Sequence, residues 1–359
     1  MKPQRIYDPE IEAIAKILPY FDFSDPNKVR ESFHQMRKML QEQGIERPTD
    51  ENVEEVERSI PGANGAPDIP IRLYRPKAVK TPMPVFINFH GGGFMLGDLE
   101  FDHPRSLVMA ARTQSMGVLV DYRLLPEHPF PAAVEDCYAT LEWVSENAKA
   151  LNIDPNRIVI GGGSAGGTLA AAVALMARDR KGPNILMQML LYPALDDQAQ
   201  TESMKNGDGL YICDNRSIRA VWCHYLGMTC LEGDNVERKK LDSQRRDGLT
   251  HNSVNHNGMS GHSLGGIDLQ DELTHISPYA APGKAKDLSK LPPAYIMTCE
   301  HDALRDEAIL YATRLMNAGV PVELHNYAGT VHGFDFLTPS SLSEQAIEDC
   351  VRAFKRACQ

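Results

Sequence analysis

A serine flanked by glycines lies between two segments of different residue pattern. The sequence reads IVIGGGSAGGT at residues 158–168, so that Ser164 is the centre of a G-x-S-x-G motif. The β-branched residues before it predict a strand, and the alanine-rich residues after it predict a helix. On such a sharp strand-to-helix turn, Gly162 and Gly166 avoid collisions between the turn and its neighbours. We therefore predict that Ser164 is a nucleophile.

A second glycine cluster, HGGGF at residues 90–94, closes an apolar segment upstream. Backbone N–H groups of consecutive glycines can bind a developing oxyanion, each contributing about 3 kcal/mol in the transition state. We predict an oxyanion hole formed by the N–H groups of Gly91, Gly92 and Ala165, with His90 as a structural residue. Taken singly, either cluster has a simpler interpretation as a phosphate-binding or idle turn. Together they favour catalysis.

A serine nucleophile needs a base, and the base needs an acid that fixes its tautomer. In hydrolases with a strand–turn–helix serine, the acid and then the histidine follow later in the chain. Asp302 follows a strand predicted at residues 294–298, and His332 follows one predicted at 322–326. Since the carboxyl ends of parallel strands meet at one edge of a sheet, we expect Ser164, Asp302 and His332 to form a triad there.

Neighbouring residues are alternatives for the acid and the base. Glu300 and Asp306 lie close to Asp302 in the sequence. An aspartate in the position of Asp306 is often a solvated charge at the start of a helix. His325 lies inside an alternating strand pattern, and His301 adjoins the proposed acid. Both are less suitable bases than the histidine that follows a strand end.

A second G-x-S-x-G pattern, GHSLGG at residues 261–266, lies in a polar segment without clear periodicity, residues 232–272. We interpret this segment as an insertion, either a lid or, preferably, a disordered loop. Without a strand before it and a helix after it, Ser263 is not expected to be a nucleophile. We expect three histidines of the same segment to be solvated rather than bound to metal, namely His251, His256 and His262.

The elements that position these residues follow an α/β pattern. Two amphipathic helices are predicted before residue 42, and further helices at 131–149 and 168–178. Because strands alternate with helices, we predict an α/β fold with a mainly parallel central sheet flanked by helices. The predicted strands are 71–74, 85–89, 118–122, 158–160, 187–191, 294–298 and 322–326.

Composition narrows the possible partners. The chain has 359 residues and a formal charge of −11, which argues against nucleic acid or an anionic membrane as a partner. No apolar segment approaches the roughly 18 residues of a membrane span, and the first residues include acids, unlike a secretory signal. The 7 cysteines show no C-x-x-C spacing. We therefore expect reduced thiols, no metal site and a cytoplasmic location.

Six motifs follow one another from residue 85 to the C-terminus, with the insertion left out. They are HGGG at 90–93, YRLLPEHPFP at 122–131, GSAGG at 163–167, SPYAAP at 277–282, DALRD at 302–306 and HGF at 332–334. In these motifs the chain resembles the hormone-sensitive-lipase-like esterases. That resemblance implies an α/β-hydrolase fold with a helical cap. Residues 1–50 would form a cap segment and 51–359 the catalytic domain, which would contain further cap elements and the insertion around 196–275. It also makes a homodimer plausible.

One position departs from the family pattern. Gly163 precedes the nucleophile, where an acid or threonine is usual, and in this respect the chain resembles some fungal tailoring esterases. The missing side chain could alter how neighbouring loops are supported. Aromatic residues near the expected cap are candidates for an apolar substrate site, or equally for ordinary cap core. These candidates are Tyr20, Phe21, Phe23, Phe94, Trp222 and Tyr225.

The function implied is hydrolysis of short-to-medium acyl esters of small molecules through an acyl-enzyme on Ser164, with no cofactor. Three other functions are compatible with the same motifs. Acyl transfer, cyclisation or deacetylation of a natural product would use the same triad, and amide hydrolysis resembles that of arylformamidases. A non-catalytic receptor resembling the gibberellin receptors is less suitable, because those lack the histidine that His332 provides here.

Overall fold

The structure is a computed structural model that describes residues 5–42, 44, 46–229, 239–240, 276–337 and 340–359. Its centre is an eight-stranded sheet of order β1-β2-β4-β3-β5-β6-β9-β10. The strands from β4 to β10 are parallel, whereas β1–β2 and β2–β4 are antiparallel pairs. The bounds are β1 Val53–Ile60, β2 Ile69–Pro76, β3 Met83–Phe89, β4 Met116–Val120, β5 Ile153–Gly163, β6 Met187–Leu191, β9 Ala294–His301 and β10 Val322–Val331.

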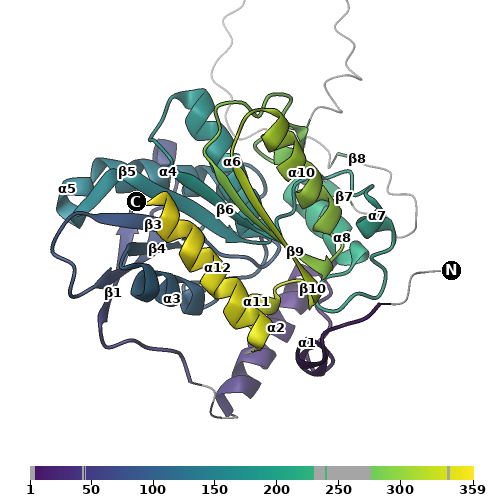
Figure 1. The fold of residues 1–359 in the computed structure, drawn as a ribbon. Helices are drawn as coiled ribbons and strands as arrows, with labels where there is room; N and C mark the ends of the chain where they lie inside the picture. The colour runs from purple at the N-terminus through teal and green to yellow at the C-terminus, as the bar shows by residue number, and fades with distance from the viewer. Residues whose placement is uncertain (1–4, 43, 45, 230–238, 241–275, 338–339) are drawn as a thin grey trace, which may run out of the picture.

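Helices cover both faces of this sheet, as predicted (Figure 1). One face packs against α3 and α12, and the other against α4, α6 and α10. The central strands are buried on both sides, which explains their continuous apolar sequences. The covering helices are α3 His103–Thr113, α4 Ala132–Glu146, α5 Ala148–Leu151, α6 Ala165–Arg180, α10 Arg305–Asn317 and α12 Ser341–Ala357.

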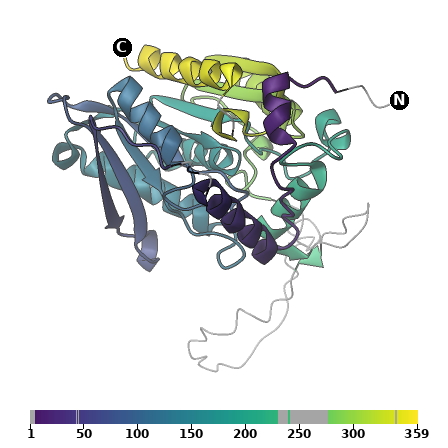
Figure 2. The same ribbon diagram turned by 90° about the horizontal axis from the view of Figure 1, so that it is seen from below.

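Further short elements lie near the carboxyl ends of the parallel strands. Figure 2 shows α2 in front of the strand ends, with one end near α8. The two helices predicted near the N-terminus are present as α1 and α2. In α2, the Arg30 side chain donates a hydrogen bond to the carbonyl oxygen of Met95, at 3.0 Å. The short elements are α1 Pro9–Ala15, α7 Glu202–Lys205, α8 Asn215–Tyr225, α11 Phe334–Leu337, η1 Ala63–Gly65 and η2 Pro282–Lys284, and the longer helix beside them is α2 Pro26–Glu42.

Each strand predicted from the sequence overlaps an observed one, but β1 was not predicted. Its sequence, VEEVERSI, has buried residues only at its two ends, so the apolar alternation that identifies a strand is missing. The predicted insertion at 232–272 lies outside the described residues, except for β8 (Lys239–Lys240), which pairs with β7 (Met228–Thr229). Ser263 and the three histidines of the insertion also lie outside. Within the described residues, no helix combines the length and apolar composition needed to cross a membrane.

Candidate active site

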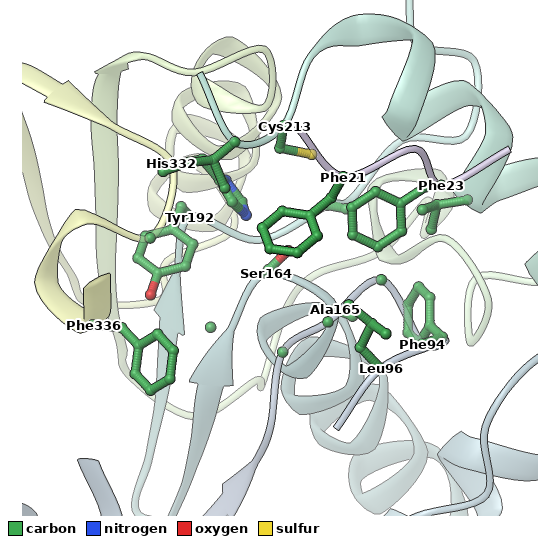
Figure 3. Close-up of a pocket in the computed structure, with 18 of the residues that line it drawn as sticks. Phe21, Phe23, Phe94, Leu96, Ser164, Ala165, Tyr192, Cys213, His332 and Phe336 are labelled. Atoms are coloured by element: carbon green, nitrogen blue, oxygen red, sulfur yellow. The ribbon is translucent and has the colours of Figure 1, made fainter. Parts of the chain in front are cut away.

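Ser164 lies on a strained turn between β5 and α6. Its backbone angles are φ 56° and ψ −120°, a conformation that residues with a side chain rarely adopt. Glycines make the turn possible: a Cβ atom on Gly162 would lie 2.1 Å from the carbonyl oxygen of Phe89, and one on Gly166 only 1.8 Å from the same atom. The end of β3 thus passes directly against the turn. The turn presents the Ser164 side chain to a cavity at the carboxyl edge of the sheet (Figure 3).

Asp302 and His332 come from the loops after β9 and β10, and they meet. The Nδ1 atom of His332 lies 2.8 Å from Oδ2 of Asp302, and both side chains are buried. The other oxygen, Oδ1, accepts the N–H of Leu304 at 2.9 Å, which fixes the carboxylate. An ionised carboxylate only accepts hydrogen bonds, so Nδ1 donates and Nε2 stays free as the basic nitrogen. In Figure 3 the ring of His332 points toward Ser164.

The alternative acids and bases are engaged elsewhere. Glu300 accepts the N–H of Gly329 at 2.7 Å, and Asp306 accepts that of Ser203 at 2.7 Å. His325 is paired with Glu323, and His301 lies 2.7 Å from a backbone oxygen near the N-terminus. The residues that line the cavity include His332 but none of these four described side chains: Glu300, Asp306, His325 and His301.

The second glycine cluster lies against the serine turn. A Cβ atom on Gly91 would be 3.1 Å from the carbonyl oxygen of Gly163 and 3.7 Å from Cβ of Ser164. Gly92 has a φ of 103°, which favours glycine. Ala165 is the first residue of α6, where N–H groups have no partner within the helix. The three residues predicted to form the oxyanion hole, Gly91, Gly92 and Ala165, all line the cavity with Ser164.

His90 lies beneath this loop. Its ring is fully buried and stacks on Tyr122, with ring centroids 4.1 Å apart. Its Nδ1 atom lies 2.8 Å from the carbonyl oxygen of Gly91, and the Tyr122 hydroxyl donates to the carbonyl oxygen of His90 at 2.7 Å. Burial lowers the pKa of His90, so the ring is neutral at physiological pH. These contacts support the structural role that the sequence suggested.

The cavity is mainly apolar, with a volume of about 980 Å³ that includes its open mouth. Phe21, Phe23, Phe94 and Trp222 line it, in agreement with the sequence analysis. Two of the predicted pocket residues do not. Tyr20 is 55% exposed and its hydroxyl lies 3.4 Å from both Asp214 and Ser217, while Tyr225 is buried in a second layer and stacks on Phe94 at 4.0 Å.

Several residues of the cavity were not predicted. Apart from Leu304, which lies in the DALRD motif, they come from parts of the chain that the motifs do not mark, since the fold brings them together only in three dimensions. Phe336 was within reach of sequence analysis, because it follows His332 by four residues, HGFDF. The additional residues are Phe33, Met36, Leu96, Phe101, Asp102, Arg105, Tyr192, Ala194, Ile212, Cys213, Ile218, Val221, Leu304 and Phe336.

A buried carboxyl group in α10 gives a prediction for pH dependence. Glu307 accepts the N–H of Leu195 at 2.6 Å, and burial raises its pKa well above the usual range. Because the folded-state pKa exceeds the unfolded one, the stability linked to this proton is complete at low pH and is lost as the pH rises through the folded pKa. We expect the free energy of unfolding to fall less between pH 6 and pH 9 in Glu307→Gln than in the wild type. Urea titrations at both pH values check this, and equal falls would contradict it.

Comparison with known proteins agrees with this geometry. The α/β hydrolase fold family matches residues 86–237 and 238–336. A carboxylesterase of Mycobacterium tuberculosis, NlhH, is 37% identical over 84% of this chain and 82% of its own length. An arylesterase of Saccharolobus solfataricus is 32% identical over 74% of this chain and 73% of its own. The solved structure of a bacterial heroin esterase is similar with a TM-score of 0.81 and 35% identity, over 99% of this chain and 98% of that one.

These matches cover most of the chain, and the glycine loop and serine turn fall within the matched family region. The chain therefore belongs to the hormone-sensitive-lipase-like carboxylesterase family of the α/β hydrolase fold.

Proposed function

We propose that the chain hydrolyses carboxylic esters through an acyl-enzyme on Ser164, with His332 as base and Asp302 as its partner. The observation that carries this proposal is the His332–Asp302 hydrogen bond of 2.8 Å in the cavity that also contains the strained Ser164 and the glycine loop. The similarity to esterases over most of the chain supports the same reaction class.

The proposed reaction has two halves. In the first, Nε2 of His332 takes the hydroxyl proton of Ser164 while Oγ bonds to the ester carbonyl carbon. The resulting oxyanion accepts hydrogen bonds from the N–H groups of Gly91, Gly92 and Ala165. His332 then protonates the departing alkoxide. In the second half, water gives a proton to His332 and attacks the acyl-enzyme. The second tetrahedral intermediate then expels Oγ of Ser164, which takes the proton back from His332, and the acid is released.

The cavity lining favours uncharged esters with apolar acyl or alcohol groups. Most of its residues are aromatic or aliphatic, whereas the charged ones, Asp102 and Arg105, pair with each other at 3.2 Å. A charged substituent would lose its hydration here with little compensation. We propose short-to-medium acyl esters of small molecules as the substrate class.

Two measurements on the wild type test this function. We expect turnover of p-nitrophenyl esters of graded acyl length, and a single adduct from a fluorophosphonate on the peptide that contains Ser164. Product analysis in the presence of added alcohols separates hydrolysis from acyl transfer, since transfer would yield a new ester. An unlabelled Ser164, or no turnover of any ester, would refute the proposal.

A pair of neighbouring aromatic residues provides a test of the cavity. Phe21 is buried in the lining, whereas Tyr20 is 55% exposed and does not line the cavity. Phe21→Ala removes apolar contact that both substrate and transition state would use, so KM for an apolar ester should rise about tenfold with little change in kcat. Tyr20→Ala is the matched control and should leave KM unchanged. Steady-state kinetics check both, and equal KM changes in the two variants would show that the lining is wrongly assigned.

Three further expectations extend this proposal. We propose that residues 1–50 act as part of a cap over the cavity, that two copies associate through β10, and that the chain functions in the cytoplasm. Within the described sheet, β10 is an edge strand that pairs only with β9. The cysteines that the structure describes are free thiols, as expected of a reducing compartment. Sedimentation equilibrium would detect the dimer.

A further inference from the structure

The residue before the nucleophile, Gly163, leaves space that another side chain occupies. A Cβ atom on Gly163 would lie 2.9 Å from the hydroxyl oxygen of Tyr192 and 3.0 Å from its Cε2. Tyr192 follows β6 and is buried, with 3% of its surface exposed. Its φ of 38° is unusual for a large residue and costs on the order of 1–3 kcal/mol. The surrounding structure therefore holds this side chain over Gly163 against a backbone preference.

The hydroxyl of Tyr192 belongs to a buried polar cluster. It donates to Oδ1 of Asp335 at 2.8 Å and accepts a hydrogen bond from Nη2 of Arg105 at 2.9 Å. Arg105 also forms ion pairs of 3.2 Å with Asp335 and with Asp102. Because these bonds are shielded from water, breaking one leaves a buried polar group without its partner.

In this cluster Arg105 stays charged and Tyr192 stays neutral. Burial lowers the pKa of Arg105, but the carboxylates of Asp102 and Asp335 more than offset this and raise it well above its usual range. Burial raises the pKa of Tyr192 well above its usual range, so the phenol keeps its proton. Tyr192 is therefore a permanent donor to Asp335 throughout the working pH range.

This cluster reaches the base of the triad in two ways. The ring of Tyr192 packs edge to face against that of His332, with centroids 4.8 Å apart. Asp335 is the second residue of α11 and follows His332 by three positions, so fixing its carboxylate also fixes the loop that carries the imidazole. Figure 3 shows Tyr192 beside His332 with its hydroxyl directed away from Ser164. The hydroxyl thus acts through the loop and does not touch the reacting atoms.

We propose that Tyr192, tied to Arg105 and Asp335 in the space left by Gly163, is a positioning residue for His332. This inference rests on the proposed function, because it assigns the cluster to the same triad. It accounts for the glycine before the nucleophile: the tyrosine hydroxyl occupies the place of a side chain there. It also accounts for a buried arginine and two carboxylates at the edge of an otherwise apolar cavity.

The test uses Tyr192→Phe, Asp335→Ala and the double variant, with Tyr311→Phe as control. Tyr311 is a buried tyrosine of α10 that does not line the cavity. Misplacing the base lowers only the chemical step, so kcat for a p-nitrophenyl ester should fall about ten- to hundredfold in each single variant while KM stays within about twofold. The double variant should lose no more than either single one, since both remove the same hydrogen bond. Tyr311→Phe should keep the wild-type kcat.

Gly163→Ala gives an independent arm. The added methyl group displaces the tyrosine hydroxyl, so we expect kcat to fall in the wild-type background and to fall less in the Tyr192→Phe background. Three results would each overturn the inference: a wild-type kcat in Tyr192→Phe, effects that multiply fully in the double variant, or a rise in KM in place of the fall in kcat. Fluorophosphonate labelling separates the two proposals. If Ser164 is labelled equally fast in the wild type and in Tyr192→Phe, only the positioning role of Tyr192 is refuted. If Ser164 of the wild type is not labelled, the proposed function is refuted.

Discussion

Ser164→Ala and His332→Ala are each expected to lower kcat for a p-nitrophenyl ester by about 10⁶, and the double variant is expected to lose no more than either one. The reason is that nucleophile and base act as a unit: without the base, Oγ keeps its proton, and without Oγ, the base has no proton to take. The residual rate would come from the oxyanion donors and from binding. Asp302→Asn should lose less, about 10⁴, because the imidazole remains but in the wrong tautomer.

Steady-state kinetics at saturating ester measure these losses, with circular dichroism confirming that each variant is folded. Two controls match the variants residue for residue. Ser263→Ala removes the serine of the second G-x-S-x-G pattern, and His325→Gln removes a histidine that the structure pairs with Glu323. Both should keep kcat near the wild-type value. If Ser263→Ala lost activity and Ser164→Ala did not, the nucleophile would be wrongly assigned. If the losses at Ser164 and His332 multiplied, the two residues would not act as one unit.

The parts of this site that sequence analysis located are those whose local geometry demands particular residues. Only glycine fits where β3 passes the serine turn, so the pattern around Ser164 is visible in the sequence. Asp302 and His332 were predicted to meet because strand ends place their loops at one edge of the sheet, and the structure places their side chains 2.8 Å apart. The parallel strands were equally clear, since burial on both faces requires continuous apolar residues.

The cavity was predicted less completely, because its shape depends on which way side chains point. Tyr20 and Phe21 are neighbours in an irregular segment, where no periodicity tells which one turns inward. Tyr225 was assigned to the cavity but supports Phe94 from behind, a second layer that residue type alone does not distinguish from the first. Tyr192 was missed because its importance comes from a glycine 29 residues earlier in the sequence and a carboxylate far along the chain.

Gly166→Ala is expected to abolish the folded serine turn. The added Cβ atom would lie 1.8 Å from the carbonyl oxygen of Phe89 and 2.8 Å from that of His90, both of them backbone atoms that cannot rotate away. Relief requires α6 and β3 to move apart, which would disturb the glycine loop and the nucleophile at the same time. We expect a loss of several kcal/mol in the free energy of unfolding, near the upper limit for single substitutions.

Gly167→Ala in the same helix turn is the matched control, since its Cβ atom would meet a side-chain atom, Cβ of Pro193, at 3.0 Å. Its Cβ atom would also lie 3.1 Å from the carbonyl oxygen of Gly162. It should cost less, because both contacts are relieved by shifts of a few tenths of an ångström. Soluble yield and urea unfolding midpoints rank the two variants. If Gly166→Ala is as stable and active as Gly167→Ala, the turn can open without cost. The close approach of β3 would then not be what holds Ser164 in its strained conformation. A large difference in stability between the two variants would indicate that the close approach of β3, which excludes a methyl group at Gly166, also holds Ser164 in place.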